Sequence, residues 1–174
     1  YREFTELGIV PASPASVHGA QASGCSPISA AMEAGTDLVK PVSKPDTIVK
    51  SLAIGTPADG FYAIQSMRTT GGHAAQATDD EVVEGIRLLA ATEGIFAETA
   101  GGVTVACARK LIESGKIPRD ESIVLCITGH GLKTQEAIMG RCGEPRLIRP
   151  SLREFEQTFA AELGIVPQEA GATA

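Results

Sequence analysis

An apolar run that stops abruptly at a polar loop is the feature that most constrains the fold. Residues 123–127 (IVLCI) are all apolar and mostly β-branched, and turn residues bound the run on both sides. The run is too short for a helix and is typical of a central strand that is covered on both faces. Thr128, Gly129, His130 and Gly131 follow directly.

This polar loop has two interpretations. In open α/β sheets, ligands bind in the loops at the carboxyl ends of the central strands, so Thr128 would place its hydroxyl at the floor of a pocket. Alternatively, the loop is an ordinary turn into a helix, with Thr128 as the helix cap and Gly129 and Gly131 relieving the backbone. These residues alone leave both interpretations open.

Composition excludes several classes of protein. With 174 residues, 43% hydrophobic and 21% charged, the chain is large enough to bury one core. A net charge of -6 with scattered signs lacks the basic stripe of a nucleic-acid-binding protein. No apolar run approaches the roughly 20 residues that span a bilayer, so we expect neither a nucleic acid nor a membrane as partner.

The four cysteines indicate the compartment. Cys25, Cys107, Cys126 and Cys142 lie far apart, with neither the spacing of a metal site nor that of a compact disulfide framework. We therefore expect no metal ion and a reducing cytoplasm.

Strand and helix patterns alternate along the chain, which predicts an α/β fold with a parallel or mixed sheet. A short strand is expected over residues 17–21, followed by a helix with Pro27 near its first position. A second strand is expected over residues 72–77, and Thr78 with Glu81 forms a capping box for the next helix. The apolar positions of that helix share one face: Val82, Val83, Ile86 and Leu89.

Several polar residues have a structural and a functional interpretation. We interpret Asp59 and Glu98 as helix caps, because each directly precedes a helix start; the alternatives are a general base for Asp59 and another chemical role for Glu98. Cys25 is interpreted as a small half-buried residue instead of a reactive thiol. His73, alone beside alanines, is interpreted as structural. Residues 35–50, with two prolines and mixed charges, are expected to be a surface excursion.

The ends of the chain suggest how it is divided. It begins at Tyr1 without a methionine, within the last turns of a helix, so we expect a fragment of a longer protein. Residues 1–140 are expected to be an incomplete catalytic α/β domain, and residues 141–165 a connector with a helix that packs on it. Residues 166–174 have no pattern and are expected to be disordered.

Three motifs, IGTPADG, EGIFAETAGG and ITGHGLKT, occur in this order at spacings similar to those of the threonine synthase family. The similarity extends upstream through VHGAQASGCSPI and downstream to PSLREFE, so it covers nearly the whole chain. The chain thus resembles the carboxyl-terminal half of these fold type II enzymes, which use pyridoxal phosphate. Two positions depart from the family pattern: Thr56 and His130 stand where asparagine is common.

The resemblance implies a three-layer α/β sandwich, most of the large domain of a tryptophan synthase beta-like enzyme. It implies conversion of O-phospho-L-homoserine and water to L-threonine and phosphate, a lyase reaction that depends on pyridoxal 5'-phosphate. Thr128 matches the hydroxyl that bonds the pyridine nitrogen of the cofactor. The Schiff-base lysine and the glycine-rich phosphate loop are expected upstream of Tyr1, and no catalytic residue is assigned within the chain.

Two alternatives to an inactive threonine synthase fragment remain. One is a threonine or serine dehydratase of the same fold, which the PADG loop disfavours. The other is a non-catalytic ligand-binding module that has lost the lysine. The sequence also leaves open whether the full-length enzyme is a homodimer.

Overall fold

The computed structural model describes residues 2–12, 15–143 and 145–164. The chain divides into two compact units, Tyr1–Met139 and Gly140–Ala174. The helices and strands of the first unit are α1 (Arg2–Glu6), β1 (Gly19–Ala22), α2 (Pro27–Glu33), α3 (Gly60–Thr69), β2 (Ala74–Ala77), α4 (Asp79–Glu93) and α5 (Thr99–Glu113), with 3-10 turns at Lys50–Leu52, Gly131–Lys133 and Gln135–Ala137.

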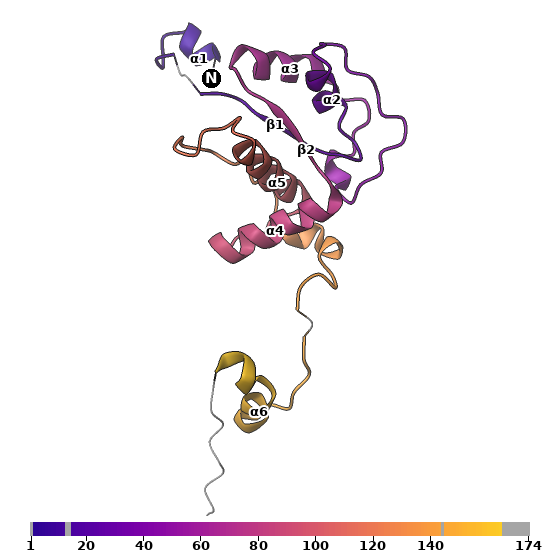
Figure 1. Ribbon diagram of the computed structural model, residues 1–174, viewed down its shortest axis with the longest axis vertical. Coiled ribbons are helices and arrows are strands. Elements are labelled where there is room, and N and C mark those ends of the chain that lie inside the picture. Colours follow the sequence, from indigo (N-terminus) through magenta and orange to yellow (C-terminus); the bar gives the residue numbers. More distant parts are fainter. Residues whose placement is uncertain (1, 13–14, 144, 165–174) are drawn as a thin grey trace, which may run out of the picture. The chain divides into compact units, whose positions relative to one another are not determined.

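The sheet of the first unit consists of the two strands β1 and β2, which pair in parallel from Gly19 opposite Ala74 to Ala22 opposite Ala77. Helix α5 packs against both strands, and α2 packs against them from the opposite side (Figure 1). Parallel strands covered by helices on both faces define an α/β fold. The predicted fold class is therefore confirmed, and both strands lie within about two residues of the predicted segments.

The start and end of α4 follow the sequence prediction. The Thr78 side chain accepts a hydrogen bond from the Glu81 amide, and the Glu81 carboxylate accepts one from the Thr78 amide across 2.7 Å. Gly94 ends the helix in the left-handed region, with a φ of 67°. The four predicted apolar residues are all buried in the core shared with α5 and the strands.

The predicted central strand over residues 123–127 is wrong for this structure. In the described part of the chain these residues pair with neither β1 nor β2. The side chain of Val124 is 89% exposed, and Cys126 is exposed as well. Ile127 alone is half-buried and packs on the core. An apolar run becomes a buried strand only where neighbouring strands satisfy its backbone, and no strand among the described residues does so.

The predicted surface excursion over residues 35–50 is wrong at one point. Thr47 and Val49 are buried, and the Thr47 hydroxyl donates to a carboxylate oxygen of Asp79 at 2.6 Å. The carboxylate of the first residue of α4 therefore anchors this part of the loop at the core. The interpretation of Asp59 as a side-chain cap is also wrong: Asp59 occupies the N-cap position of α3, but its side chain makes no capping hydrogen bond.

The second unit contains α6 (Leu152–Leu163). The Ser151 side chain accepts from the Glu154 amide, as predicted, and Gly164 ends the helix. The rings of Phe155 and Phe159 lie 5.0 Å apart on one face. The expected disordered tail, residues 166–174, lies outside the described residues. Within the described part of the chain, no helix is both long enough and apolar enough to traverse a bilayer.

Candidate functional site

Two short segments meet at the amino-terminal end of α5, and one of them contains Thr128. The segment just before α5 pairs with the loop after residue 127 through an isolated antiparallel bridge between Ala97 and His130. The Glu98 amide donates to the Gly129 carbonyl at 3.0 Å, and the Gly131 amide donates to the Phe96 carbonyl at 2.8 Å. The loop is therefore fixed to the helix start by backbone hydrogen bonds on both sides of His130.

Thr128 lies at the edge of this arrangement. Its side chain is exposed, and among the described residues its hydroxyl has no hydrogen-bond partner. The alternative interpretation of Thr128 as a helix cap is wrong, because the 3-10 turn that follows is capped by His130, whose Nδ1 accepts from the Leu132 amide. A hydroxyl that is both exposed and unpartnered is free to bond a ligand.

The interpretation of Glu98 as a side-chain cap is also wrong. Glu98 occupies the N-cap position of α5, but its carboxylate makes no capping hydrogen bond. Instead the Thr134 hydroxyl accepts from the Thr99 amide at 3.1 Å, so the loop supplies the cap. The Glu98 side chain is 5% exposed, and its Oε2 lies 2.9 Å from Nζ of Lys133. The sequence pattern missed this contact because the loop residues are 35 positions away in sequence.

Aromatic and glycine contacts fix the rest of the loop. The Phe96 and His130 rings meet edge to face, with centroids 5.6 Å apart. A β-carbon added at Gly131 would lie 2.3 Å from the Phe96 ring, so only glycine permits this approach. Two buried polar atoms in the same place have no hydrogen-bond partner among the described residues: Glu98 Oε2 and Thr99 Oγ1.

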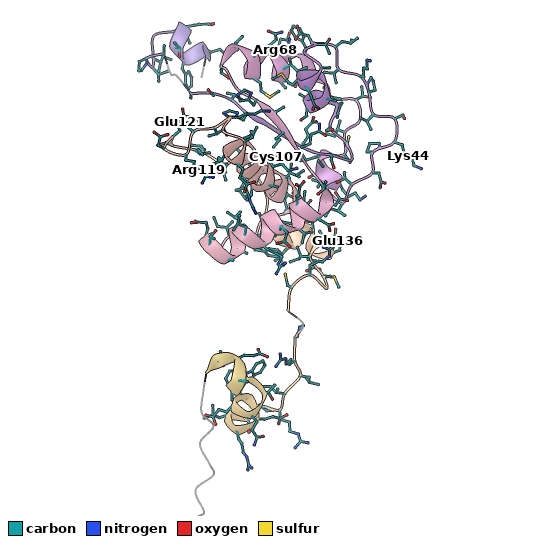
Figure 2. All side chains as sticks on the ribbon, in the orientation of Figure 1. Lys44, Arg68, Cys107, Arg119, Glu121 and Glu136 are labelled. Atoms are coloured by element: carbon teal, nitrogen blue, oxygen red, sulfur yellow. The ribbon has the colours of Figure 1, made fainter. Side chains whose placement is uncertain are left out.

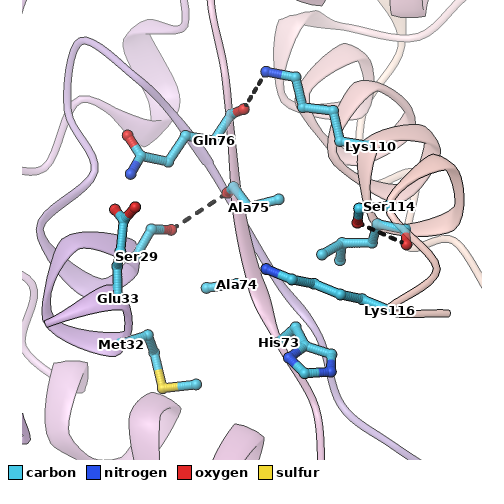
Figure 3. A pocket seen from close by; sticks show the side chains of 11 residues that line it. Ser29, Met32, Glu33, His73, Ala74, Ala75, Gln76, Lys110, Ser114 and Lys116 are labelled. Atoms are coloured by element: carbon cyan, nitrogen blue, oxygen red, sulfur yellow. Dashed lines mark hydrogen bonds between the residues drawn. The ribbon is translucent and has the colours of Figure 1, made fainter. Parts of the chain in front are cut away.

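A cavity of about 390 Å³ lies elsewhere, along the outer edge of β2 (Figure 3). It separates α2 from α5, and Lys110 and Lys116 line it together with His73. Lys110 donates to the Gln76 carbonyl at 2.8 Å and to the Glu81 carboxylate at 2.7 Å. No residue of the loop around Thr128 lines this cavity, so these lysines lie outside the candidate site.

Burial shifts the pKa of two cysteines, Cys25 and Cys107, and of one histidine, His18. Burial raises the pKa of the Cys107 thiol to about 11, and Cys107 lies on α5 beside the strands (Figure 2). Burial also raises the pKa of Cys25, so neither is a reactive thiolate. Burial, with a smaller contribution from His73, lowers the pKa of His18, and Glu121 opposes this.

Metal ligation was not predicted for any residue. Among the described residues, no group of three or more histidine, cysteine or acidic side chains lies close enough together to hold a metal ion. The candidate site is the Thr128 hydroxyl and the loop that holds it.

The chain belongs to a family of enzymes that use pyridoxal phosphate. Residues 1–129 match the family model described as "Pyridoxal-phosphate dependent enzyme". The predicted cofactor is therefore confirmed for this family.

Within this family, the chain is similar to threonine synthases. The chain is 37% identical over 159 residues to the threonine synthase of Methanosarcina acetivorans, covering 91% of this chain and 39% of that protein. It is 39% identical over 145 residues to that of Methanocaldococcus jannaschii, covering 83% of this chain and 36% of the relative. The chain thus spans well under half the length of these relatives.

A solved structure shares the fold. Maize serine racemase matches with a TM-score of 0.52 and 16% identity, over 72% of this chain and 38% of that chain. At this identity the similarity concerns the fold alone, and it agrees with the predicted α/β fold of the fold type II enzymes.

The residues at the candidate site fit one part of the cofactor. Thr128 offers a neutral hydroxyl with no partner among the described residues, which suits the pyridine nitrogen. The Gly131 amide already donates to the Phe96 carbonyl, so it is not available to a phosphate group. Lys133 is held by Glu98. The fit of these residues to the cofactor is therefore limited to its ring nitrogen.

Proposed function

We propose that the full-length protein is a threonine synthase, which converts O-phospho-L-homoserine and water to L-threonine and phosphate. The observation that carries the proposal is the exposed Thr128 hydroxyl, held on a fixed loop in a chain 37% identical to a threonine synthase. Thr128 would donate a hydrogen bond to the unprotonated pyridine nitrogen. The segments lining the rest of the site are contributed by the remainder of the full-length enzyme.

The cofactor and Thr128 would have different roles, and the role of Thr128 follows from the chemistry of a hydroxyl group. When bound, pyridoxal phosphate supplies the electron sink that allows protons and the γ-phosphate to leave the substrate. Thr128 orients the ring, but a neutral hydroxyl does not hold the ring nitrogen protonated as a carboxylate would. It therefore moderates the electron sink, which favours replacement of phosphate by water over side reactions such as transamination.

A dehydratase of the same fold is the second candidate. It would release a ketoacid from threonine or serine and would form no threonine from phosphohomoserine. The PADG loop, residues 57–60, resembles that of threonine synthases and disfavours this alternative.

A substrate panel on the full-length protein distinguishes the two. With added pyridoxal phosphate, we expect equal amounts of phosphate and threonine from O-phospho-L-homoserine, and little ketoacid from threonine or serine. Ketoacid release without threonine formation would favour the dehydratase. If cofactor and substrates bind but no product forms, the non-catalytic module becomes the better description.

We further propose that residues 1–174 alone form no threonine. The Schiff-base lysine is expected in the part of the enzyme that precedes this sequence. Lys110 and Lys133 are engaged with acidic side chains, and Lys116 lies at the β2 cavity. Supplying the amino-terminal half in trans should restore activity, whereas turnover by residues 1–174 alone would show that the lysine has been misplaced.

The assembly proposals rest on sequence pattern alone. We propose a cytoplasmic enzyme with a small-molecule substrate. A homodimer is the assembly that we would test first, by light scattering of the full-length protein.

A further inference from the structure

The buried carboxylate of Glu98 holds the residue next to Thr128. A β-carbon added at Gly129 would lie 2.1 Å from Oε1 of Glu98 and 2.2 Å from its carboxyl carbon. The carboxylate therefore packs directly against the Gly129 backbone, in the space that any other side chain would need. The Glu98 amide also donates to the Gly129 carbonyl at 3.0 Å. Side chain and backbone of one residue thus hold the same loop position.

The charge of Glu98 is compensated by the same loop. Its Oε2 lies 2.9 Å from Nζ of Lys133, whose side chain is 64% exposed. This ion pair lacks hydrogen-bond geometry, since Oε2 has no hydrogen-bond partner among the described residues. Burying a carboxylate is unfavourable unless it is paired, and the positive end of the α5 dipole adds to the compensation. Loss of Lys133 would therefore leave a buried charge with less support.

A simple helix cap would not need this arrangement. The Thr134 hydroxyl already accepts from the Thr99 amide, and the Glu98 carboxylate makes no capping hydrogen bond to an amide of α5. The carboxylate instead contacts Gly129 and Lys133, on a loop that starts directly after Thr128. A residue with these contacts is suited to fix the position of the loop.

We propose that Glu98 is a positioning residue: its buried carboxylate, packed on Gly129 and paired with Lys133, fixes the place of the Thr128 hydroxyl. The proposal rests on the proposed function, in which that hydroxyl bonds the cofactor ring. Glu98 itself acts through the loop and is not assigned any contact with substrate or cofactor.

The first test measures the loop in the full-length protein without cofactor. Glu98→Gln keeps the shape of the side chain and removes its charge. Lys133→Met removes the cation from an exposed position that should not impair folding. Hydrogen exchange of peptides covering residues 128–134 should become about tenfold faster in both variants, because local opening becomes easier. Exchange within twofold of wild type in both variants would overturn the proposal.

A matched control lies on the same helix. Glu113 pairs with Arg109 across 2.6 Å in an exposed position near the end of α5. Glu113→Gln removes the carboxylate charge from an ion pair within α5 and does not touch the loop, so exchange of residues 128–134 should stay at the wild-type rate. Faster exchange in this control as well would mean that general helix stability, not Glu98, fixes the loop.

The second test uses the contact between Glu98 and Gly129. Gly129→Ala should speed hydrogen exchange of residues 128–134, because the added methyl group would collide with the Glu98 carboxylate. In the Glu98→Ala background the same substitution should have a much smaller effect, because the space is then empty. Equal effects of Gly129→Ala in both backgrounds would contradict the packing contact.

Cofactor spectra separate failure of this inference from failure of the proposed function. Glu98→Gln should shift the absorbance of bound pyridoxal phosphate and lower kcat more than it raises KM. If Thr128→Ala leaves the spectrum unchanged while Glu98→Gln speeds exchange, the loop role stands and the ring contact fails. If Thr128→Ala changes the spectrum while Glu98→Gln changes neither exchange nor spectrum, Glu98 is not a positioning residue.

Discussion

The Thr47 hydroxyl donates a hydrogen bond to Oδ1 of Asp79 at 2.6 Å, and the Ile48 amide donates to Oδ2 of the same carboxylate at 3.1 Å. These two bonds join the long connector after α2 to the first residue of α4. Thr47 is 3% exposed, so its hydroxyl has little access to water. The Asp79 carboxylate therefore anchors the connector, and Asp79 is also the first residue of α4.

Removing this hydroxyl should destabilise the first unit. We expect Thr47→Val to lower the free energy of unfolding by about 1 to 2 kcal/mol, because a hydrogen bond to a charged group is lost with little change of shape. Urea denaturation would measure the change. Thr92→Val is the control: its hydroxyl donates to the Leu88 carbonyl on an exposed turn of α4, and the change should stay within about 0.5 kcal/mol.

The cysteines should differ sharply in reactivity. In residues 1–174, Cys126 and Cys142 are exposed whereas Cys25 and Cys107 are buried. Brief treatment with iodoacetamide at pH 8, followed by mass spectrometry, should modify the exposed pair first, because burial raises the pKa of Cys25 and Cys107. If Cys126 is protected as well as Cys107, residues 123–127 are covered, as their apolar pattern alone predicts.

His18 should make stability depend on pH. Burial lowers its pKa below the usual 6.5, and its Nδ1 accepts from the His73 amide at 3.1 Å. The folded state therefore binds a proton less readily than the unfolded state. His18 contributes stability that is fully present above about pH 6.5 and is lost as the pH falls toward its lowered folded-state pKa.

His18→Asn tests this dependence. Asparagine keeps an acceptor for the His73 amide and does not titrate. Between pH 7 and pH 5.5, the free energy of unfolding should fall more in wild type than in the variant. Above pH 7.5, the two free energies should change with pH in the same way. Parallel curves over the whole range would show that His18 does not contribute.

Local patterns predicted the parts of the fold that local interactions determine. The capping box of Thr78 and Glu81, the stop at Gly94 and the buried face of α4 all depend on residues within a few positions of each other. The two strands were predicted from short segments that precede helix starts, and the alternation of strands with helices predicted a parallel or mixed sheet. Such features need no knowledge of distant partners.

Features that depend on distant partners were predicted wrongly. Residues 123–127 have the pattern of a covered strand, but no strand among the described residues pairs with them. Glu98 has the position of a cap, but its carboxylate faces Gly129 and Lys133. The hydroxyl that caps α5 comes from Thr134, which lies 35 positions further along the chain. A pattern in one segment contains no information on which of these contacts forms.

The most direct test concerns Thr128, the residue that links this chain to the cofactor. Threonine formation and the absorbance of bound pyridoxal phosphate would be measured in full-length wild type, Thr128→Ala and Thr128→Ser. Because ring position affects each step, Thr128→Ala should lower turnover by at least about tenfold and alter the spectrum, while lowering the free energy of unfolding by no more than about 0.5 to 1.5 kcal/mol. Thr128→Ser keeps the hydroxyl and should retain most of the activity. A Thr128→Ala protein with wild-type turnover and a wild-type spectrum would contradict the assignment.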